Sequence, residues 1–479
     1  MAATPLKPDL CIIGASPAGI RLAMRAREYD ASVILIDRGE AGVEGPWTTA
    51  IPARALAAAA AKAQALRDAP AFGISGADPA PSFRAVHDHV AGVIASMTPA
   101  TSTERLTALG IAVISGPAAF IDKRTLQAGD SQIRARRFVI ATGARPLVPA
   151  IKGLTEVPFF TTRSIFTNTK KLTHLVVIGT GADALTLAQA YRRLGSEVTL
   201  ISAGPVLAGF DPEGVEIVLG RLREEGLVVH DHVGHVEIVP RSQGIGINLT
   251  LPGDEELALD ASHILVAIGD APDLDSIDLD KAEIKRATDA SYRLQLGPGL
   301  RTGNRRIFAI GDAAGASQPH AAMEQADLVL ENVLLGIAGR YAEQMVPKVV
   351  TTDPGLGHVG LTEPEARKRY KTGYSVLRAN YAENDLARAT RQTHGMAKLI
   401  IDGKGGVIGA SVTGSGAEDL LAFFAFSMAK GLNAADLGGF VAPHPSFAAL
   451  VRELGELYLA QRGPTQWQKR RQALARLLP

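Results

Sequence analysis

Two glycine-rich turns have the residue types and the spacing that could bind a dinucleotide. The first lies in Asp9-Leu-Cys-Ile-Ile-Gly14-Ala-Ser16-Pro-Ala-Gly19, where a short apolar strand runs into a turn and then into a helix pattern. Gly14 permits a tight turn, and Gly19 lets the helix pack closely on the strand. Free N–H groups at the helix start would then face a pyrophosphate. Ser16 replaces the middle glycine of the pattern and is small enough to permit close approach.

A carboxylate follows the first turn at the position that a ribose would need. The predicted strand Val33–Ile36 ends in Asp37, which can hydrogen-bond a ribose hydroxyl. Taken alone, this segment also fits a glycine-rich strand-to-helix turn that binds no ligand.

A second copy of the pattern favours the dinucleotide interpretation. Leu175-Val-Val-Ile-Gly179-Thr-Gly181-Ala-Asp-Ala184 repeats the strand, the turn and the helix, with Ala184 in place of the third glycine. Two such units predict two dinucleotides. The following strand, Val198–Ile201, ends in Ser202 instead of an acidic residue, and no arginine follows closely to bind a 2′-phosphate. The sequence therefore leaves NADH and NADPH as equal alternatives.

The length and composition indicate what kind of protein carries these turns. At 479 residues, with 46% hydrophobic and 21% charged residues, the chain predicts an ordinary globular protein of about two to four domains. A net charge of +1 and 5% aromatic residues give no reason to expect a nucleic-acid partner. No apolar stretch is long enough to span a bilayer, and Met1–Pro8 lacks the apolar core of a signal peptide. We therefore expect a cytoplasmic protein, and we assign no metal site.

Further motifs follow in order along the chain. They are Phe138–Pro146 with Thr142-Gly143, Leu265–Pro272 with Gly269, Arg306–Gly315 with Gly311-Asp312, Pro347–Pro354 with Val359–Glu363, and His444-Pro445-Ser446. Together with the two turns, these motifs resemble the class I pyridine nucleotide–disulfide oxidoreductases. That family includes dihydrolipoamide dehydrogenase, glutathione reductase, mercuric reductase and soluble transhydrogenase. The resemblance is collinear from about Leu10 to Leu454.

The resemblance implies an α/β fold with two Rossmann-type domains, which bind FAD and NAD(P), and a C-terminal α+β dimerisation domain. Residues 1–150 and 273–340 would form the FAD-binding domain, residues 151–272 an inserted NAD(P)-binding domain, and residues 341–479 the dimerisation domain with a basic tail. It also implies a homodimer with FAD and with NADH or NADPH as cofactors. The cofactor-binding residues that we assign are Gly14, Ser16, Gly19, Asp37, Arg54, Thr142, Gly143, Gly311, Asp312, Gly179, Gly181, Ala184, Ser202 and Gly269.

The sequence departs from this family at the residues that carry its disulfide chemistry. The only cysteine is Cys11, and the two cysteine positions of the family correspond to Gly45 and Ala50. One cysteine cannot form an intrachain disulfide. The family's lysine near flavin N5 becomes Arg54, and its partner glutamate falls at Thr186.

The candidate catalytic residues are His444, Arg54 and Trp47, and each has a structural alternative. Trp47 could stack a flat acceptor beside the flavin, or it could only fill space. Arg54 could stabilise the reduced flavin by its charge, or it could form an unrelated ion pair. His444 could give a proton to a reduced acceptor, or its turn could shape the dimer interface. Ala449 falls where the family has the glutamate that orients this histidine, so tautomer control and some basicity would be lost.

Two hypotheses about function follow from these residues. In the first, the protein is an FAD-dependent NAD(P)H oxidoreductase that passes electrons from flavin directly to a quinone, a nicotinamide or a similar small acceptor. In the second, it is a catalytically retired flavin-binding homologue that serves as a scaffold or binding subunit. Reduction of dihydrolipoamide or glutathione by its own cysteines is chemically implausible. The basic tail Gln461–Pro479 could lie on a membrane surface, but a solvated or partner-docking helix is favoured.

Overall fold

The described residues fold into two compact units. A computed structural model describes residues 4–38, 49–289, 292–316, 318–463 and 466–476. Unit 1 comprises Met1–Gly204 and Val228–Glu343, and unit 2 comprises Pro205–Leu227 and Gln344–Pro479. The segment Pro205–Leu227 therefore packs with the C-terminal part of the chain, although both of its neighbours in sequence belong to unit 1.

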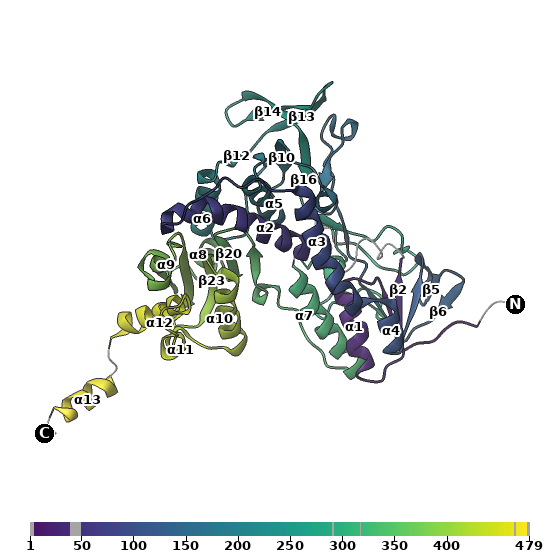
Figure 1. Ribbon diagram of the computed structural model, residues 1–479. Helices are drawn as coiled ribbons and strands as arrows, with labels where there is room; N and C mark the ends of the chain where they lie inside the picture. Colours follow the sequence, from purple (N-terminus) through teal and green to yellow (C-terminus); the bar gives the residue numbers. More distant parts are fainter. Residues whose placement is uncertain (1–3, 39–48, 290–291, 317, 464–465, 477–479) are drawn as a thin grey trace. The chain divides into compact units, whose positions relative to one another are not determined.

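A parallel sheet in unit 1 carries the first glycine turn. It contains β1 (Leu10–Ile13), β2 (Val33–Asp37), β3 (Ile111–Ser115), β7 (Arg137–Ile140) and β18 (Ile307–Ala309), in the spatial order β18-β7-β1-β2-β3. All residues of the apolar run Leu10–Ile13 are buried, as expected for a central parallel strand covered on both faces. Helices α1 (Pro17–Arg27) and α7 (Pro319–Leu330) lie side by side (Figure 1), and their buried residues join the core of this sheet.

A second parallel sheet in unit 1 carries the second glycine turn. It contains β9 (Phe160–Thr161), β10 (His174–Ile178), β11 (Glu197–Ile201), β12 (Val228–His230) and β16 (His263–Val266), in the order β12-β11-β10-β16-β9. Helix α5 (Ala182–Arg193) follows β10 and packs against β11. The two sheets repeat one arrangement, in which a buried strand, a glycine turn and a helix follow each other. The structure confirms the two predicted Rossmann-type units.

The other elements of unit 1 connect and cover these sheets. The helices are α2 (Ala50–Asp68), α3 (Phe83–Met97) and α4 (Thr103–Ala108). Antiparallel sheets are formed by β4 (Ala118–Asp122), β5 (Thr125–Ala128) and β6 (Ser131–Ile133), and by β13 (His235–Pro240), β14 (Ile245–Leu251) and β15 (Glu255–Ala261). Strands β8 (Ala144–Pro146) and β17 (Asp270–Pro272) pair antiparallel where the chain passes out of and back into the first parallel sheet.

Unit 2 is an antiparallel sheet with helices on it, as expected for the α+β domain. The strands are β19 (Lys348–Val350), β20 (Gly355–Gly360), β21 (Tyr374–Asn380), β22 (Met396–Asp402) and β23 (Val407–Gly414), in the order β19-β20-β23-β22-β21. The helices are α6 (Pro212–Glu224), α8 (Glu363–Tyr370), α9 (Asp385–Ala389), α10 (Ala417–Lys430), α11 (Ala434–Gly439), α12 (Ala448–Arg462) and α13 (Gln466–Ala475). Among the described helices, none has the length and the apolar character that a bilayer crossing requires.

The two faces of the unit 2 sheet bury different side chains. Because side chains alternate along a strand, Ala397, Leu399 and Ile401 face the core that α10 and α12 complete. Lys398 lies on the opposite face, and only 1% of its side chain is exposed. Its Nζ donates to both carboxylate oxygens of Asp211, at 2.8 and 2.9 Å.

Other charges surround this buried lysine. The Nζ of Lys398 also lies 2.8 Å from Glu213 and 3.2 Å from Glu363, and Arg378 bonds both of these glutamates. Burial acts to lower the pKa of Lys398, but the hydrogen bonds to Asp211 and Glu213 raise it overall. The cluster thus fixes the start of α6, whose N-cap is Asp211, to the sheet.

Candidate functional site

The first glycine turn has room for no side chain at its tightest point. Gly14 follows β1 with φ of +114°, and its N–H donates to Ile36 O at 3.0 Å. A Cβ on Gly14 would lie 2.3 Å from the carbonyl oxygen of Ala141, which directly follows the neighbouring strand β7. A Cβ on Gly19 would lie 2.4 Å from Gly14 O. Both glycines are therefore required by the turn itself.

Ser16 has a role that the sequence pattern alone did not reveal. Its hydroxyl accepts the N–H of Gly19 at 3.2 Å, which makes Ser16 the N-cap of α1, and Pro17 occupies the first helical position. Serine at the N-cap and proline after it are preferred at helix starts, so this signal was present in the sequence. Asp37, the last residue of β2, is half-buried at the same edge of the sheet.

Polar groups gather at the carboxyl ends of β7 and β18. The Oγ1 of Thr142 is buried and has no hydrogen-bond partner among the described residues, so it could bond a ligand. Gly311 donates its N–H to the Oε1 of buried Gln325 at 2.8 Å, which fixes the turn that carries Asp312. Burial, with a contribution from Asp270, raises the pKa of Asp312 to about 6.

The second glycine turn repeats the geometry of the first. A Cβ on Gly179 would lie 2.2 Å from Ala267 O and 3.1 Å from the Cβ of Ala184. Gly181 is the N-cap of α5, and a Cβ there would meet no atom within 4 Å. The close contact at Gly179 is required for packing, whereas the open space at Gly181 leaves the helix N-terminus accessible to a phosphate.

Directly after β11, the strand that follows this turn, a local hydrogen bond engages the side chain of Ser202. The hydroxyl of Ser202, which is buried, bonds the backbone of Gly204. Gly269, with φ of +106°, accepts the N–H of Leu147 at 2.9 Å and ends the crossing from β16. Because the Ser202 hydroxyl already bonds its own turn, it does not indicate whether the ribose carries a 2′-hydroxyl or a 2′-phosphate. NADH and NADPH therefore stay equal alternatives.

An unexpected group of acids lies around these turns in unit 1. Burial and the nearby charge of Asp270 raise the pKa of Asp183, in the first turn of α5, to about 6. Burial also raises the pKa of Asp270, although Arg163 at 3.9 Å acts to lower it. Asp183 is nevertheless an exposed residue, so solvent screens part of its charge. Ionised Asp183 would oppose a pyrophosphate at the helix N-terminus.

Replacing Asp183 by asparagine should therefore favour both the folded apoprotein and dinucleotide binding. A raised pKa means that folding loses stability as the pH rises from about 4 through about 6. We expect Asp183→Asn to gain about 1 kcal/mol at pH 8, or about 2–4 °C in Tm, and less as the pH falls toward 4. The Kd for NADH should fall about two- to fivefold. Thermal melts and fluorescence titration measure both effects, and exposed Asp130→Asn is the matched control. An equal gain at every pH would contradict this interpretation.

The three catalytic candidates have different outcomes. Trp47 lies outside the described residues. Arg54 lies on the exposed side of the second turn of α2, and its role stays a prediction. His444 belongs to unit 2, is largely exposed, and has its Nε2 4.0 Å from the Asp385 carboxylate. Sequence comparison pointed to Ala449 as a missing partner and did not find Asp385, which lies at the start of α9.

Cys11 is a core residue. It lies in β1 with no exposed surface, and burial raises the pKa of its thiol. A protonated buried thiol is a poor nucleophile, so Cys11 has no accessible chemistry.

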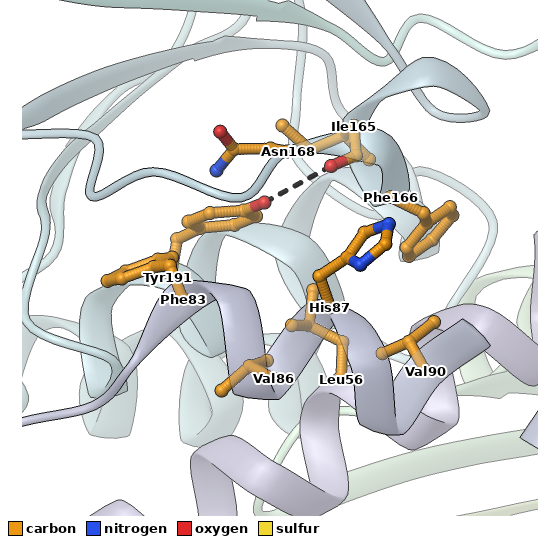
Figure 2. A pocket seen from close by; sticks show the side chains of 9 residues that line it. All are labelled: Leu56, Phe83, Val86, His87, Val90, Ile165, Phe166, Asn168 and Tyr191. Carbon is orange, nitrogen blue, oxygen red and sulfur yellow. Dashed lines mark hydrogen bonds between the residues drawn. The ribbon is translucent and has the colours of Figure 1, made fainter. Parts of the chain in front are cut away.

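A small recess between α2, α3, α5 and the turn Ser164–Thr167 offers no room for a substrate. Its volume is about 10 Å³, which suits about one water molecule. Figure 2 shows the hydroxyl of Tyr191 directed at the carbonyl of Ile165, to which it donates at 3.3 Å, and His87 on the α3 side. Apolar side chains line most of this recess. We interpret it as a packing defect between helices.

The residues present fit two dinucleotides of the expected kinds. In each turn, glycine leaves the backbone uncovered where a Cβ would be an obstruction. Each turn also directly precedes the N-terminus of a helix. The buried hydroxyl of Thr142 follows β7, which is next to β1, and the carboxylate of Asp312 follows β18, the next strand beyond β7, where FAD would need polar partners. Gly14 and Gly19 would support the pyrophosphate of FAD, and Gly179 and Gly181 that of the nicotinamide dinucleotide.

Comparison with known proteins agrees with this geometry. Residues 8–326 match the model of the pyridine nucleotide-disulphide oxidoreductases, and residues 346–454 match that family's dimerisation domain. A dihydrolipoyl dehydrogenase of Thermus scotoductus is 31% identical over 94% of this chain and 96% of its own length. A mercuric reductase of Staphylococcus aureus is 29% identical over 92% of this chain and 80% of its own length.

A solved structure shows the same fold. The HOCl-induced flavoprotein disulfide reductase RclA from Escherichia coli superposes with a TM-score of 0.81, covering 94% of this chain and 100% of its own, at 23% identity. Because both family models match in order and together span most of the sequence, the assignment does not depend on any one motif. The chain therefore belongs to the pyridine nucleotide-disulphide oxidoreductase family, whose members bind FAD and use NADH or NADPH.

Proposed function

We propose that this protein is an NAD(P)H oxidoreductase that passes electrons from FAD directly to a small acceptor, without a redox disulfide. The observation that carries the proposal is the state of Cys11. It is the only cysteine of the chain, it is fully buried in β1, and burial raises the pKa of its thiol. Both glycine turns keep the close packing that a dinucleotide site requires.

The chain's own residues bind and orient the reactants in this proposal. Bound FAD supplies the redox chemistry, because it takes a hydride from a nicotinamide and gives electrons to an acceptor. The N-terminus of α1, capped by Ser16, would hold the pyrophosphate of FAD, and the N-terminus of α5 would hold that of the nicotinamide dinucleotide. Gln325 holds the turn at Gly311, so that Asp312 keeps its position at the end of β18.

We propose a quinone, a second nicotinamide or a similar small oxidant as the acceptor, giving diaphorase- or transhydrogenase-like activity. An acceptor that takes electrons from flavin needs no thiol of the protein. The dimerisation domain supports a homodimer, in which His444 could give a proton to the reduced acceptor. The cytoplasmic location stays a prediction.

A specific observation favours a second function, a flavin-binding subunit that no longer reacts with nicotinamides. Asp183 places a carboxylate in the first turn of α5, where its charge would oppose the pyrophosphate of a bound dinucleotide. Ser202 is committed to the backbone of Gly204. Such a protein would keep FAD and serve as a scaffold.

An anaerobic titration decides between the two functions. Purified FAD-loaded protein is mixed with NADH and, separately, with NADPH, and the absorbance of the oxidised flavin is followed. We expect at least one donor to bleach the band within seconds, after which a panel of quinones and nicotinamides identifies the acceptor. A band that neither donor changes would contradict the oxidoreductase proposal and support the scaffold.

The absence of thiol chemistry has its own test. Iodoacetamide and arsenite should leave the rate of acceptor reduction unchanged, because a buried, protonated thiol does not react. Cys11→Ala should keep the rate within about twofold, since it changes only packing in β1. Inhibition of the native protein by arsenite would show that a dithiol takes part and would refute a direct transfer from flavin.

A further inference from the structure

The first parallel sheet of unit 1 has a strongly basic edge. β7 begins with Arg137, and Arg306 directly precedes β18; the N–H of Phe138 donates to Arg306 O at 2.9 Å. These are the amino ends of strands whose carboxyl ends lead to the dinucleotide turns at Gly143 and Gly311. The basic edge is therefore the edge opposite to the cofactor site.

A pocket opens at this edge. We call it the arginine pocket; it has a volume of about 350 Å³ and is lined by Asp122, Arg124, Arg134, Ala135 and Arg306. The backbone around it is held in place, because Asn304 Nδ2 donates to the carbonyls of Lys123 and Ala282, at 2.9 and 3.0 Å. The N–H of Arg134 donates to Leu6 O at 2.8 Å. The pocket is thus built from three separate chain segments with fixed backbones.

The charges of the pocket are not balanced. Asp122, the carboxylate among the described lining residues, accepts the N–H of Arg124 at 2.7 Å. Burial acts to raise the pKa of Asp122, but hydrogen bonds from Arg124 and Thr125, with the charge of Arg134, lower it overall. Arg134 Nε also donates to Thr125 Oγ1 at 3.0 Å. The guanidinium groups of Arg124 and Arg306 have no carboxylate partner in the part of the chain that the structure describes. Partial burial and then the charges of Arg136, Arg306 and Arg301 lower the pKa of Arg137, which indicates repulsion among like charges.

The lining residues limit the kinds of anion that could balance this positive charge. Guanidinium groups match the oxygen atoms of phosphate groups with paired hydrogen bonds. The volume lies at the small end of the range for ligand pockets. None of the described residues that line the pocket is aromatic, so they offer no platform on which a nucleobase could stack. The chemistry favours a compact anion with several charges over a nucleotide.

We propose that the arginine pocket binds a small phosphate-bearing anion with more than one negative charge, of the size and charge of inorganic pyrophosphate. Arg124, Arg134 and Arg306 bind its oxygen atoms, and Asp122 positions the backbone of the Arg124 turn. This site is separate from both dinucleotide sites, and it does not depend on whether the flavin is reduced by a nicotinamide.

Isothermal titration of the FAD-loaded protein with inorganic pyrophosphate tests the proposal. We expect binding at one site per chain that weakens as salt is added and that persists in saturating ADP-ribose, which occupies the nicotinamide dinucleotide site. Arg124→Gln with Arg306→Gln should weaken binding about tenfold or more. Arg84→Gln is the matched control, since Arg84 is an exposed arginine on α3. Citrate, a polyanion without phosphate, should bind more weakly than pyrophosphate.

Several results would overturn the proposal. They are the absence of pyrophosphate binding, displacement by ADP-ribose, unchanged affinity in the double variant, or an affinity for citrate equal to that for pyrophosphate. Retained FAD and an unchanged circular dichroism spectrum show that each variant is folded. If the double variant does not retain FAD, the single variants Arg124→Gln and Arg306→Gln carry the same test, each with a smaller loss.

Discussion

Replacing Gly179 by alanine should abolish reduction of the flavin by NADH and NADPH, while FAD stays bound. A Cβ at this position would lie 2.2 Å from the carbonyl oxygen of Ala267, so β10 and β16 would have to move apart at the turn. A displacement of about 1 Å at the dinucleotide site costs about 100-fold in rate, and we expect at least that loss. Stopped-flow absorbance of the flavin under anaerobic conditions measures it.

Comparison with the variant Gly181→Ala distinguishes a loss of stability from a loss of NADH binding. No atom lies within 4 Å of a Cβ at Gly181, so this variant should melt at the same temperature as the native protein. Its methyl group would still point into the space that a pyrophosphate would occupy, so the Kd for NADH should rise. Native reduction rates in Gly179→Ala would contradict the assignment of this turn. Equal melting temperatures for the two variants would contradict the packing argument.

The second large effect is expected in unit 2, where Lys398→Met should destabilise the fold by about 3–5 kcal/mol. Methionine has a similar length, so the packing is nearly kept while the charge is lost. The carboxylate of Asp211, which is 1% exposed, would then be buried without its main partner. Unfolding in urea, followed by circular dichroism, measures the change. Lys404→Met is the matched control, because Lys404 is exposed on the turn between β22 and β23.

A double variant shows whether the effect is electrostatic. Asparagine is also a good N-cap, so Asp211→Asn keeps the bond to the N–H of Glu213 and removes the charge. Adding it to Lys398→Met should restore at least about 1 kcal/mol. If the losses of unfolding free energy in the two single variants simply add in the double variant, this would contradict a buried charge pair.

The same cluster predicts how stability depends on pH. The hydrogen bond from Arg378, with a contribution from Lys398, lowers the pKa of Glu213 to about 2, below its ordinary value of 4.5. The stability that ionised Glu213 contributes is therefore present above about pH 4.5 and lost as the pH falls through about 2. The loss of unfolding free energy caused by Arg378→Gln should therefore become smaller as the pH falls from about 4.5 to about 2.

The features that the sequence predicted correctly depend on local patterns. The apolar run before Gly14 and the one before Gly179 each gave a buried strand followed by a glycine turn and a helix. Both patterns act within about 20 residues, and glycine is needed there because a neighbouring carbonyl leaves no room for a Cβ.

The features that could not be predicted depend on residues far apart in the sequence. Asp385, at the start of α9, approaches His444 in the loop before α12, and no spacing rule connects the two positions. Burial raises the pKa values of Asp183 and Asp270, and the charge of Asp270 adds to the effect on Asp183; both causes depend on how separate segments of unit 1 pack together. Lys398 and Asp211 are 187 residues apart, so their bond has no sequence signature.

The separation of Lys398 from Asp211 has a consequence for synthesis on the ribosome. Ribosomes add about 5–20 residues per second, so Asp211 would be made about 10–40 s before the lysine that it binds 187 residues later. Until β22 and β23 are made, Pro205–Leu227 lacks Lys398 and the contacts of α6 with β23, although the strands of unit 1 on both sides of it in sequence, β11 and β12, have been made long before. Nascent chains stalled before β22 should therefore expose this segment to proteases, and chains released after β23 should protect it.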